Sequence, residues 1–203
     1  KSSVSAAFVA LEKKVVVADC DVDAPNLYLI FDPTHDEEQK FVGGEKAVID
    51  YTVCTNCGFC VDFCRFDAIY QKEGKVVISD VSCDGCYLCS RICPEKAITI
   101  KKEDDSRLYS GTFRYGKMVY GILAPGEENS GHLVNAVREK AEAVAAANQI
   151  ETIVIDGPPG IGCPVISAIT GVDMALIVTE PTLSGLNDME RIKAVLDHFK
   201  ITS

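Results

Sequence analysis

Two kinds of apolar pattern alternate along the chain. Short continuous runs rich in β-branched residues predict strands buried on both faces, and segments with apolar positions every three to four residues predict amphipathic helices. The predicted strands are 15–18, 117–123, 152–156 and 174–179, and the predicted helices are 3–11, 133–147, a short one after Pro164, and 186–199. Because strand and helix alternate, we expect an α/β fold with a parallel sheet and helices on its faces.

One region interrupts this alternation. Residues 49–100 hold eight of the ten cysteines, the polar segment 34–44 indicates a linker, and 101–116 is polar again. We therefore predict one α/β domain that is split by a small inserted α+β domain. The predicted bounds are 1–45 and 104–203 for the two parts of the α/β domain, and 46–103 for the insert.

Composition narrows the class of protein. With 203 residues, 47% of them hydrophobic, the chain can bury a full core. No apolar run approaches the roughly 20 residues that span a bilayer, and no segment resembles a secretion signal, so we expect a cytoplasmic protein. The net charge of −10 and the pI near 4.8 disfavour attraction to phosphate backbones, so nucleic acid is not an expected partner.

The clustered cysteines form two copies of one motif, C-x2-C-x2-C-x3-C, in CTNCGFCVDFC and CDGCYLCSRIC. The second copy follows the first by 29 residues, both from Cys54 to Cys83 and from Cys64 to Cys93. The match extends to Ile49 with Ile78 and to the Ala-Ile pairs at 68–69 and 97–98. This region is therefore an internal duplication.

The motif is typical of iron–sulfur proteins. Three cysteines spaced by two residues can hold three corners of a cubane, and the fourth thiolate must come from elsewhere. Structural zinc is the alternative, but zinc needs no third closely spaced cysteine. Over about 50 residues the region resembles bacterial dicluster ferredoxins, in which the fourth cysteine of each run serves the other run's cluster. The resemblance implies one [4Fe-4S] cluster on Cys54, Cys57, Cys60 and Cys93, and another on Cys83, Cys86, Cys89 and Cys64.

One position departs from that pattern. Arg65 stands where a proline commonly follows the fourth cysteine, whereas Pro94 is present in the second run. A positive charge there would raise the potential of one cluster.

A second chemical signal lies in the α/β part. Lys1 and Ser2 match the last two positions of a P-loop, in which the lysine contacts phosphates and the hydroxyl binds Mg²⁺. The tripeptide KSS is, however, also a common start of a helix. Acids at 19, 21 and 23 follow the first strand, and Asp156 ends a later one, at the edge where ligands bind such sheets. Loop acids that cap a helix, and a plain turn in DGPPG, are the alternatives.

Together these segments resemble the MinD-type deviant Walker A ATPases, the group of ParA, MinD and the nitrogenase iron protein, and within it the members with an inserted ferredoxin domain. The matching segments are 1–27, 126–134 and 153–192. The resemblance implies that Lys1 and Ser3 contact nucleotide, that Ser2, Asp19 and Asp156 hold Mg²⁺, that Asp21 orients the attacking water, and that Gly160 senses the γ-phosphate. The catalytic residues would be Lys1, Asp21 and Asp156.

That family also has features that this sequence does not contain. The signature lysine and the loop glycines would precede Lys1, and further strands with adenine-binding residues would follow Ser203. We therefore expect a partial chain.

Two cysteines lie outside the duplicated motif. Cys20 is expected to be a small buried residue. Cys163 begins a predicted helix, whose dipole lowers a thiol pKa, and the nitrogenase iron protein has a bridging cluster ligand at a similar place. A plain small residue at the helix start is the simpler interpretation.

The leading functional hypothesis is an ATP-hydrolysing iron–sulfur protein that couples a nucleotide-dependent switch to electron transfer. Its cofactors would be two [4Fe-4S] clusters and Mg²⁺ with ATP, and its partners a redox or iron–sulfur protein and, with nucleotide bound, a second copy of itself. The alternative is a ferredoxin-type carrier or assembly scaffold in which nucleotide is regulatory or absent. A DNA-positioning ATPase with redox-sensing clusters is a weaker third, because the chain is acidic.

Overall fold

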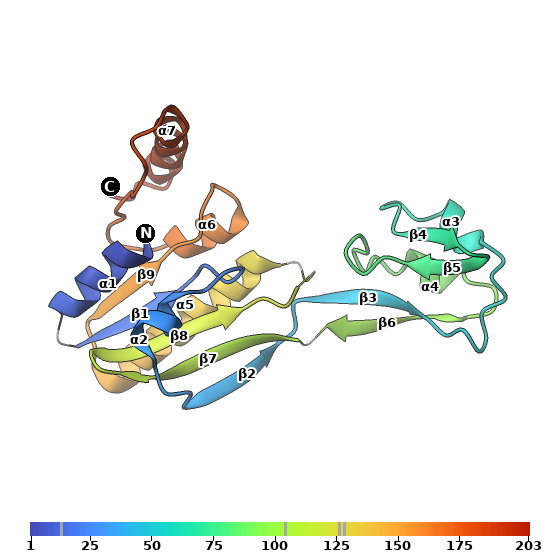
Figure 1. Cartoon of the computed structure of the whole chain (residues 1–203), viewed down its shortest axis with the longest axis horizontal. Coiled ribbons are helices and arrows are strands. Elements are labelled where there is room, and N and C mark those ends of the chain that lie inside the picture. The colour runs from blue at the N-terminus through green and yellow to red at the C-terminus, as the bar shows by residue number, and fades with distance from the viewer. Residues whose placement is uncertain (13, 104, 126, 128) are drawn as a thin grey trace. The chain divides into compact units, whose positions relative to one another are not determined.

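The computed structural model describes residues 1–12, 14–103, 105–125, 127 and 129–203, and it divides into two compact units (Figure 1). The first unit comprises Lys1–Phe41, Arg107–Leu123 and Asn129–Ser203. The second comprises Val42–Ser106 and Ala124–Glu128.

The first unit contains a five-stranded sheet in the order β2-β7-β8-β1-β9. The central strand β1 runs parallel to both neighbours, with Val15 opposite Gly116 of β8 and Asp19 opposite Asp156 of β9. Strand β7 is antiparallel to β8. The bounds are β1 Val15–Asp19, β2 Glu37–Phe41, β7 Ser106–Phe113, β8 Gly116–Ile122 and β9 Thr152–Asp156. The prediction of an α/β fold built on parallel strands is confirmed.

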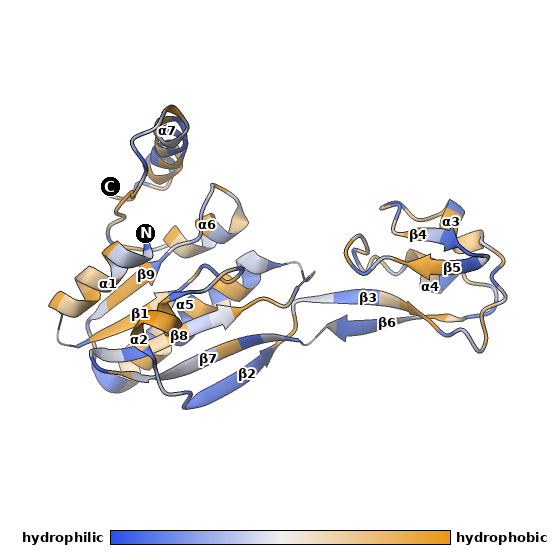
Figure 2. Ribbon diagram, viewed as in Figure 1, coloured by the Kyte–Doolittle hydropathy of each residue, from blue (hydrophilic) through white to orange (hydrophobic). Residues whose placement is uncertain are grey.

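Helices cover both faces of this sheet, and this explains why β1 is buried at every position and apolar from Val15 to Ala18. On one face, the inner side of α5 packs Leu133 and Val137 against Val16 and Val119. On the other, Val9 of α1 and Leu27 of α2 join residues of β1 and β8 in a second core cluster. The bounds are α1 Ser2–Leu11, α2 Leu27–Phe31, α5 Ser130–Asn148, α6 Cys163–Ile169 and α7 Leu183–His198. Figure 2 shows β1 as a mostly hydrophobic strand.

Three sequence predictions about the elements were wrong. The polar segment 34–44 is not only a linker, because it contains β2, whose side chains are mostly exposed, as suits a strand at the end of the sheet order. The segment 101–116 contains the whole of β7, most of whose positions are buried. The predicted strand 174–179 forms only an isolated bridge, from Met174 to Thr202, within the described residues.

The second unit shows the duplication in three dimensions. Strand β3 (Gly44–Ile49) pairs antiparallel with β6 (Ile98–Glu103), and β4 (Ile69–Lys72) pairs with β5 (Lys75–Ile78). Ile49 lies opposite Ile98, and their repeat partners Ile78 and Ile69 lie opposite each other in turn. The short helices α3 (Phe59–Asp62) and α4 (Leu88–Ile92) begin at equivalent positions of the two repeats. The unit therefore consists of two similar halves, and each pair of strands contains one strand from each half.

Candidate metal centres and phosphate site

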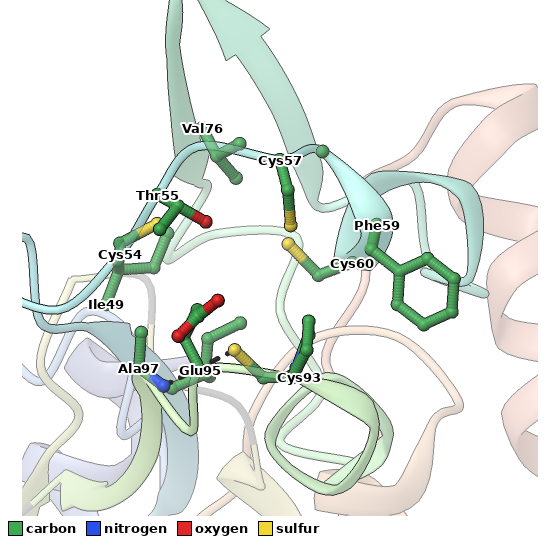
Figure 3. A pocket seen from close by; sticks show the side chains of 13 residues that line it. Ile49, Cys54, Thr55, Cys57, Phe59, Cys60, Val76, Cys93, Glu95 and Ala97 are labelled. Atoms are coloured by element: carbon green, nitrogen blue, oxygen red, sulfur yellow. Dashed lines mark hydrogen bonds between the residues drawn. The ribbon is translucent and has the colours of Figure 1, made fainter.

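The first cysteine cavity lies in the second unit, beside α3. Cys54 and Cys57 come from the loop before α3, Cys60 lies in that helix, and Cys93 directly follows α4. Figure 3 shows these four side chains around one space. The remaining lining is mostly apolar and includes Ile49, Val76, Ala97 and Ile98. The structure therefore brings together the four cysteines that the ferredoxin resemblance assigns to one cluster.

The backbone around this cavity is arranged for sulfur ligands. Gly58 adopts a left-handed φ of 78° directly before α3, which turns the loop into the helix. The backbone N–H of Asn56 donates to the Sγ of Cys54 at 3.4 Å, and that of Ala97 donates to the Sγ of Cys93 at 3.3 Å. Such donors stabilise thiolate ligands of a reduced cluster.

The second cavity repeats the arrangement. Cys83, Cys86 and Cys89 line it together with Cys64, the fourth cysteine of the other run. Tyr87, with a φ of 65°, occupies the position equivalent to Gly58 before α4. The backbone N–H of Ala47 donates to the Sγ of Cys83 at 3.4 Å.

The free thiols in these cavities are unfavourable as isolated anions. Burial raises the pKa of Cys60, and the neighbouring Cys57, Cys93 and Cys54 raise it further. Burial raises the pKa of Cys89 to about 11, again with added repulsion from neighbouring thiols. A bound metal removes this cost, since it supplies the positive charge that four converging thiolates lack.

The donor set fits an iron–sulfur cubane. Within the part of the chain that the structure describes, no group of three His, Cys, Asp or Glu side chains is placed to share a single metal ion. Each cavity instead surrounds a space with four cysteines, as the four corner irons of a cubane require.

The candidate phosphate site lies in the first unit, where β1 and β9 end and α1 begins. Asp19 and Asp156 are neighbours in register across β1 and β9. The Nζ of Lys1 donates to the carbonyl oxygen of Gly157 at 2.6 Å, and the Oγ of Ser5 donates to the Oδ1 of Asp156 at 3.1 Å. Residues from α1, β1 and β9 thus meet at the carboxyl edge of the parallel strands, where such sheets bind ligands.

Two acids at this edge, Asp19 and Asp21, differ in surroundings. Burial raises the pKa of Asp21, the Lys1 ammonium opposes that shift, and Asp23 and Asp156 add to it. Burial raises the pKa of the inaccessible Asp19 to about 6, against the lowering effect of its backbone hydrogen bonds. Asp21 is therefore within electrostatic reach of Lys1 and Asp156, and Asp19 is within reach of Asp156.

Asp19 is held by the backbone. Its Oδ1 accepts from the N–H of Asp21 at 3.2 Å, and its Oδ2 accepts from the N–H groups of Asn26 at 3.1 Å and Leu27 at 3.0 Å. This carboxylate fixes the turn that carries Asp21 and the start of α2.

Replacing Asp19 by Ala is expected to destabilise the fold by about 2–4 kcal/mol, since it leaves the buried N–H of Leu27 and two partly buried backbone N–H groups without their acceptor. Urea unfolding followed by circular dichroism measures this change. Replacing the exposed Asp23 by Ala is the control and should alter the unfolding midpoint little. Equal midpoints for the two variants would contradict this structural role.

The remaining residues that the sequence analysis singled out lie in both the helices and the loops of the first unit. Ser2 and Ser3 lie in the first turn of α1, and Gly160, with a φ of 89°, lies in the loop between β9 and α6. Cys163 is exposed at the start of α6. Cys20 is buried, and its burial raises the pKa of the thiol to about 12, so it is a poor nucleophile.

Two residues near these sites, Ser5 and Lys46, were not identified from the sequence. Ser5 lies one helical turn after Lys1, and this spacing was a signal that both could face the same strand end. Lys46 is buried in β3 and donates from Nζ to the carbonyl oxygen of Cys83 at 2.9 Å, a long-range contact that no local pattern indicates.

Comparison with known proteins defines the class of the insert. Residues 47–70 match the family described as 4Fe-4S binding domain. A ferredoxin of Pyrobaculum islandicum is 32% identical over 98 residues, which cover 40% of this chain and 92% of that protein. The second unit therefore contains a ferredoxin-type 4Fe-4S binding domain, and that part of the sequence prediction is confirmed.

The whole chain belongs to the family of the uncharacterized protein MJ0578 of Methanocaldococcus jannaschii, with 37% identity over 204 residues, 99% of this chain and 70% of that protein. The uncharacterized protein MJ0579 of the same organism is 27% identical over 192 residues, covering 93% of this chain and 66% of that protein. Among solved structures, the cell division ATPase MinD of Pyrococcus furiosus aligns with 99% of this chain and 61% of its own, with a TM-score of 0.47 and 17% identity. No helix in the described residues is long and apolar enough to cross a membrane.

Proposed function

We propose that the protein is an ATPase that carries two [4Fe-4S] clusters and links nucleotide turnover to electron transfer. The observation that carries the ATPase part is the meeting of Lys1, Asp21 and Asp156 at one edge of the parallel sheet. Two cavities with four cysteines each support the two clusters.

At the nucleotide site, each of these side chains has a distinct task. Lys1, now bonded to the Gly157 carbonyl, turns its ammonium to the β- and γ-phosphates of ATP. Asp21 would accept a hydrogen bond from the attacking water, and Asp156 and the hydroxyl of Ser2 would hold Mg²⁺. Bound Mg²⁺ supplies neutralisation of the charge that develops on the phosphates. Asp19 contributes by fixing the backbone of Asp21.

In the second unit, the protein's own groups protect and tune the redox centres. The apolar linings exclude water, and the backbone N–H groups of Asn56, Ala97 and Ala47 donate to the ligand sulfurs. When bound, the clusters supply one-electron storage at low potential.

The connection between the two activities is supported by the chain path. Only two residues, 104 and 105, separate β6 of the second unit from β7 of the sheet. The segment between β8 and α5 also packs in the second unit, where Glu127 accepts from the Oγ of Ser106 and from the N–H of Asp105 at 3.3 Å. The sheet is thus joined to the cluster unit at the start of β7 and after the end of β8.

The test is an anaerobic preparation of the intact protein, analysed for iron, acid-labile sulfide and ATP turnover together. We expect about eight irons and eight sulfides per chain, with steady ATP hydrolysis that requires Mg²⁺. A full complement of iron without nucleotide binding would favour the electron-carrier alternative.

A further inference from the structure

The duplication allows the surroundings of the two cavities to be compared position by position. Lys46 and Lys75 are repeat partners, 29 residues apart. Lys46 is only 5% exposed, and its Nζ lies 2.9 Å from the carbonyl oxygen of Cys83. Lys75 is exposed on β5. The same residue type thus occupies a buried place at the second cavity and a solvated place in the other half.

One pair of residues explains this asymmetry. Gly85, with a φ of 61°, allows β3 to approach so closely that a Cβ at that position would lie 2.2 Å from the carbonyl oxygen of Glu45. Its repeat partner is Asn56, whose Oδ1 accepts from the backbone N–H of Val76 at 3.0 Å. In the first half, the side chain of Asn56 therefore separates β5 from the cysteine loop. In the second half, β3 itself approaches the cysteine loop, and this places Lys46 beside Cys83.

A buried ammonium beside one cluster has a direct electrostatic consequence. A cubane with four thiolates is an anion, and it becomes more negative when it accepts an electron. A fixed positive charge in a buried place stabilises the reduced form more than the oxidised form, with little screening by salt.

The acidic side chains that line the two cavities are matched between them. Asp84 lines the second cavity and Glu95 the first, so each cavity has one acid, and both are exposed. Arg65, next to Cys64, is exposed and acts in the same direction as Lys46.

We propose that Lys46 raises the reduction potential of the cluster held by Cys83, Cys86, Cys89 and Cys64 above that of the other cluster, so that a single electron resides there. This inference rests on the proposed function, since it requires that both cavities hold clusters. It makes the second cluster the acceptor end of electron flow within the unit.

The experiment compares the wild type with Lys46→Gln in the iron-loaded intact protein, reduced by one electron. The distribution of the electron is read from the hyperfine-shifted cysteine β-protons in paramagnetic NMR. These signals are assigned to a cluster through contacts with Tyr87 in the second cavity or Phe59 in the first. Lys46→Gln is expected to shift the ratio of the two reduced forms at least tenfold toward the first cluster, which is about 59 mV for one electron.

Two variants serve as controls. Lys75→Gln removes the same charge from the equivalent repeat position and should leave the ratio unchanged. Lys46→Arg keeps the charge and should keep the electron on the second cluster. These outcomes separate a charge effect from a packing effect.

Several results would overturn the inference. An electron that resides on the first cluster in the wild type, or equal shifts for Lys46→Gln and Lys75→Gln, would do so even with eight irons bound. If Lys46→Gln fails to load iron, the wild-type measurement still contradicts the inference when the electron resides on the first cluster. Fewer than two clusters in the wild type would instead remove the proposed function, and this inference with it.

Discussion

Replacing Cys64 by Ser is expected to remove the cluster of the second cysteine run, although Cys64 belongs to the first run. Cys64 lines the cavity of Cys83, Cys86 and Cys89. Loss of one of four thiolates leaves a cubane with an open corner that water can attack. We expect iron to fall from about eight to about four per chain, measured by iron and sulfide analysis with EPR of the reduced protein.

Double variants make this test sharper. Cys64→Ser combined with Cys86→Ser should lose no more iron than either change alone, because both act on one cluster. Cys64→Ser combined with Cys57→Ser should remove nearly all the iron. Cys163→Ser changes an exposed cysteine outside both cavities and should leave iron content and the EPR spectrum unaltered. If Cys64 and Cys57 instead behaved as one unit, each run would hold its own cluster.

The parts of the fold that the sequence predicted are those in which burial alone determines the pattern. Strands β1 and β9 lie within the sheet layer between helices, so their apolar runs were unambiguous. Strand β2 was missed because its residues are polar and mostly exposed, and β7 was missed because Ser106 and Ser110 place polar residues at buried positions. The apolar run at 174–179 was predicted as a strand but does not form one. A strand also needs a neighbour to pair with, and within this run only Met174 forms a bridge, to Thr202, among the described residues.

For the sites, too, local features could be predicted from the sequence and long-range contacts could not. Cysteine spacing within one loop is local, and the resemblance to dicluster ferredoxins implied the exchange of fourth ligands, so both cavities could be outlined from the sequence. The environment of each cavity depends on contacts between distant segments. The difference between Gly85 and Asn56 determines how close a strand approaches, and so buries Lys46 and not Lys75. Two identical lysines at equivalent positions could not be distinguished without this packing.

Replacing Asp21 by Asn is expected to reduce ATP hydrolysis by the intact protein about 10²–10⁴-fold, the range typical for loss of a residue that accepts a proton or orients the nucleophile. Asp21 interacts electrostatically with Lys1 and Asp156 and is only partly buried, so its carboxylate can reach a bound water. The measurement is phosphate release under saturating ATP and Mg²⁺, together with nucleotide affinity.

Asp23→Asn is the matched control, since it removes the same charge two residues away from an exposed position. We expect Asp23→Asn to retain most of the turnover and Asp21→Asn to bind ATP with little change in affinity, because orientation of water affects kcat more than ground-state binding. Equal losses for both variants would indicate a general effect of charge on nucleotide binding. Full activity in Asp21→Asn would place the hydrolytic water elsewhere on this edge of the sheet and would leave Asp156, beside Ser5, as the acid to change next.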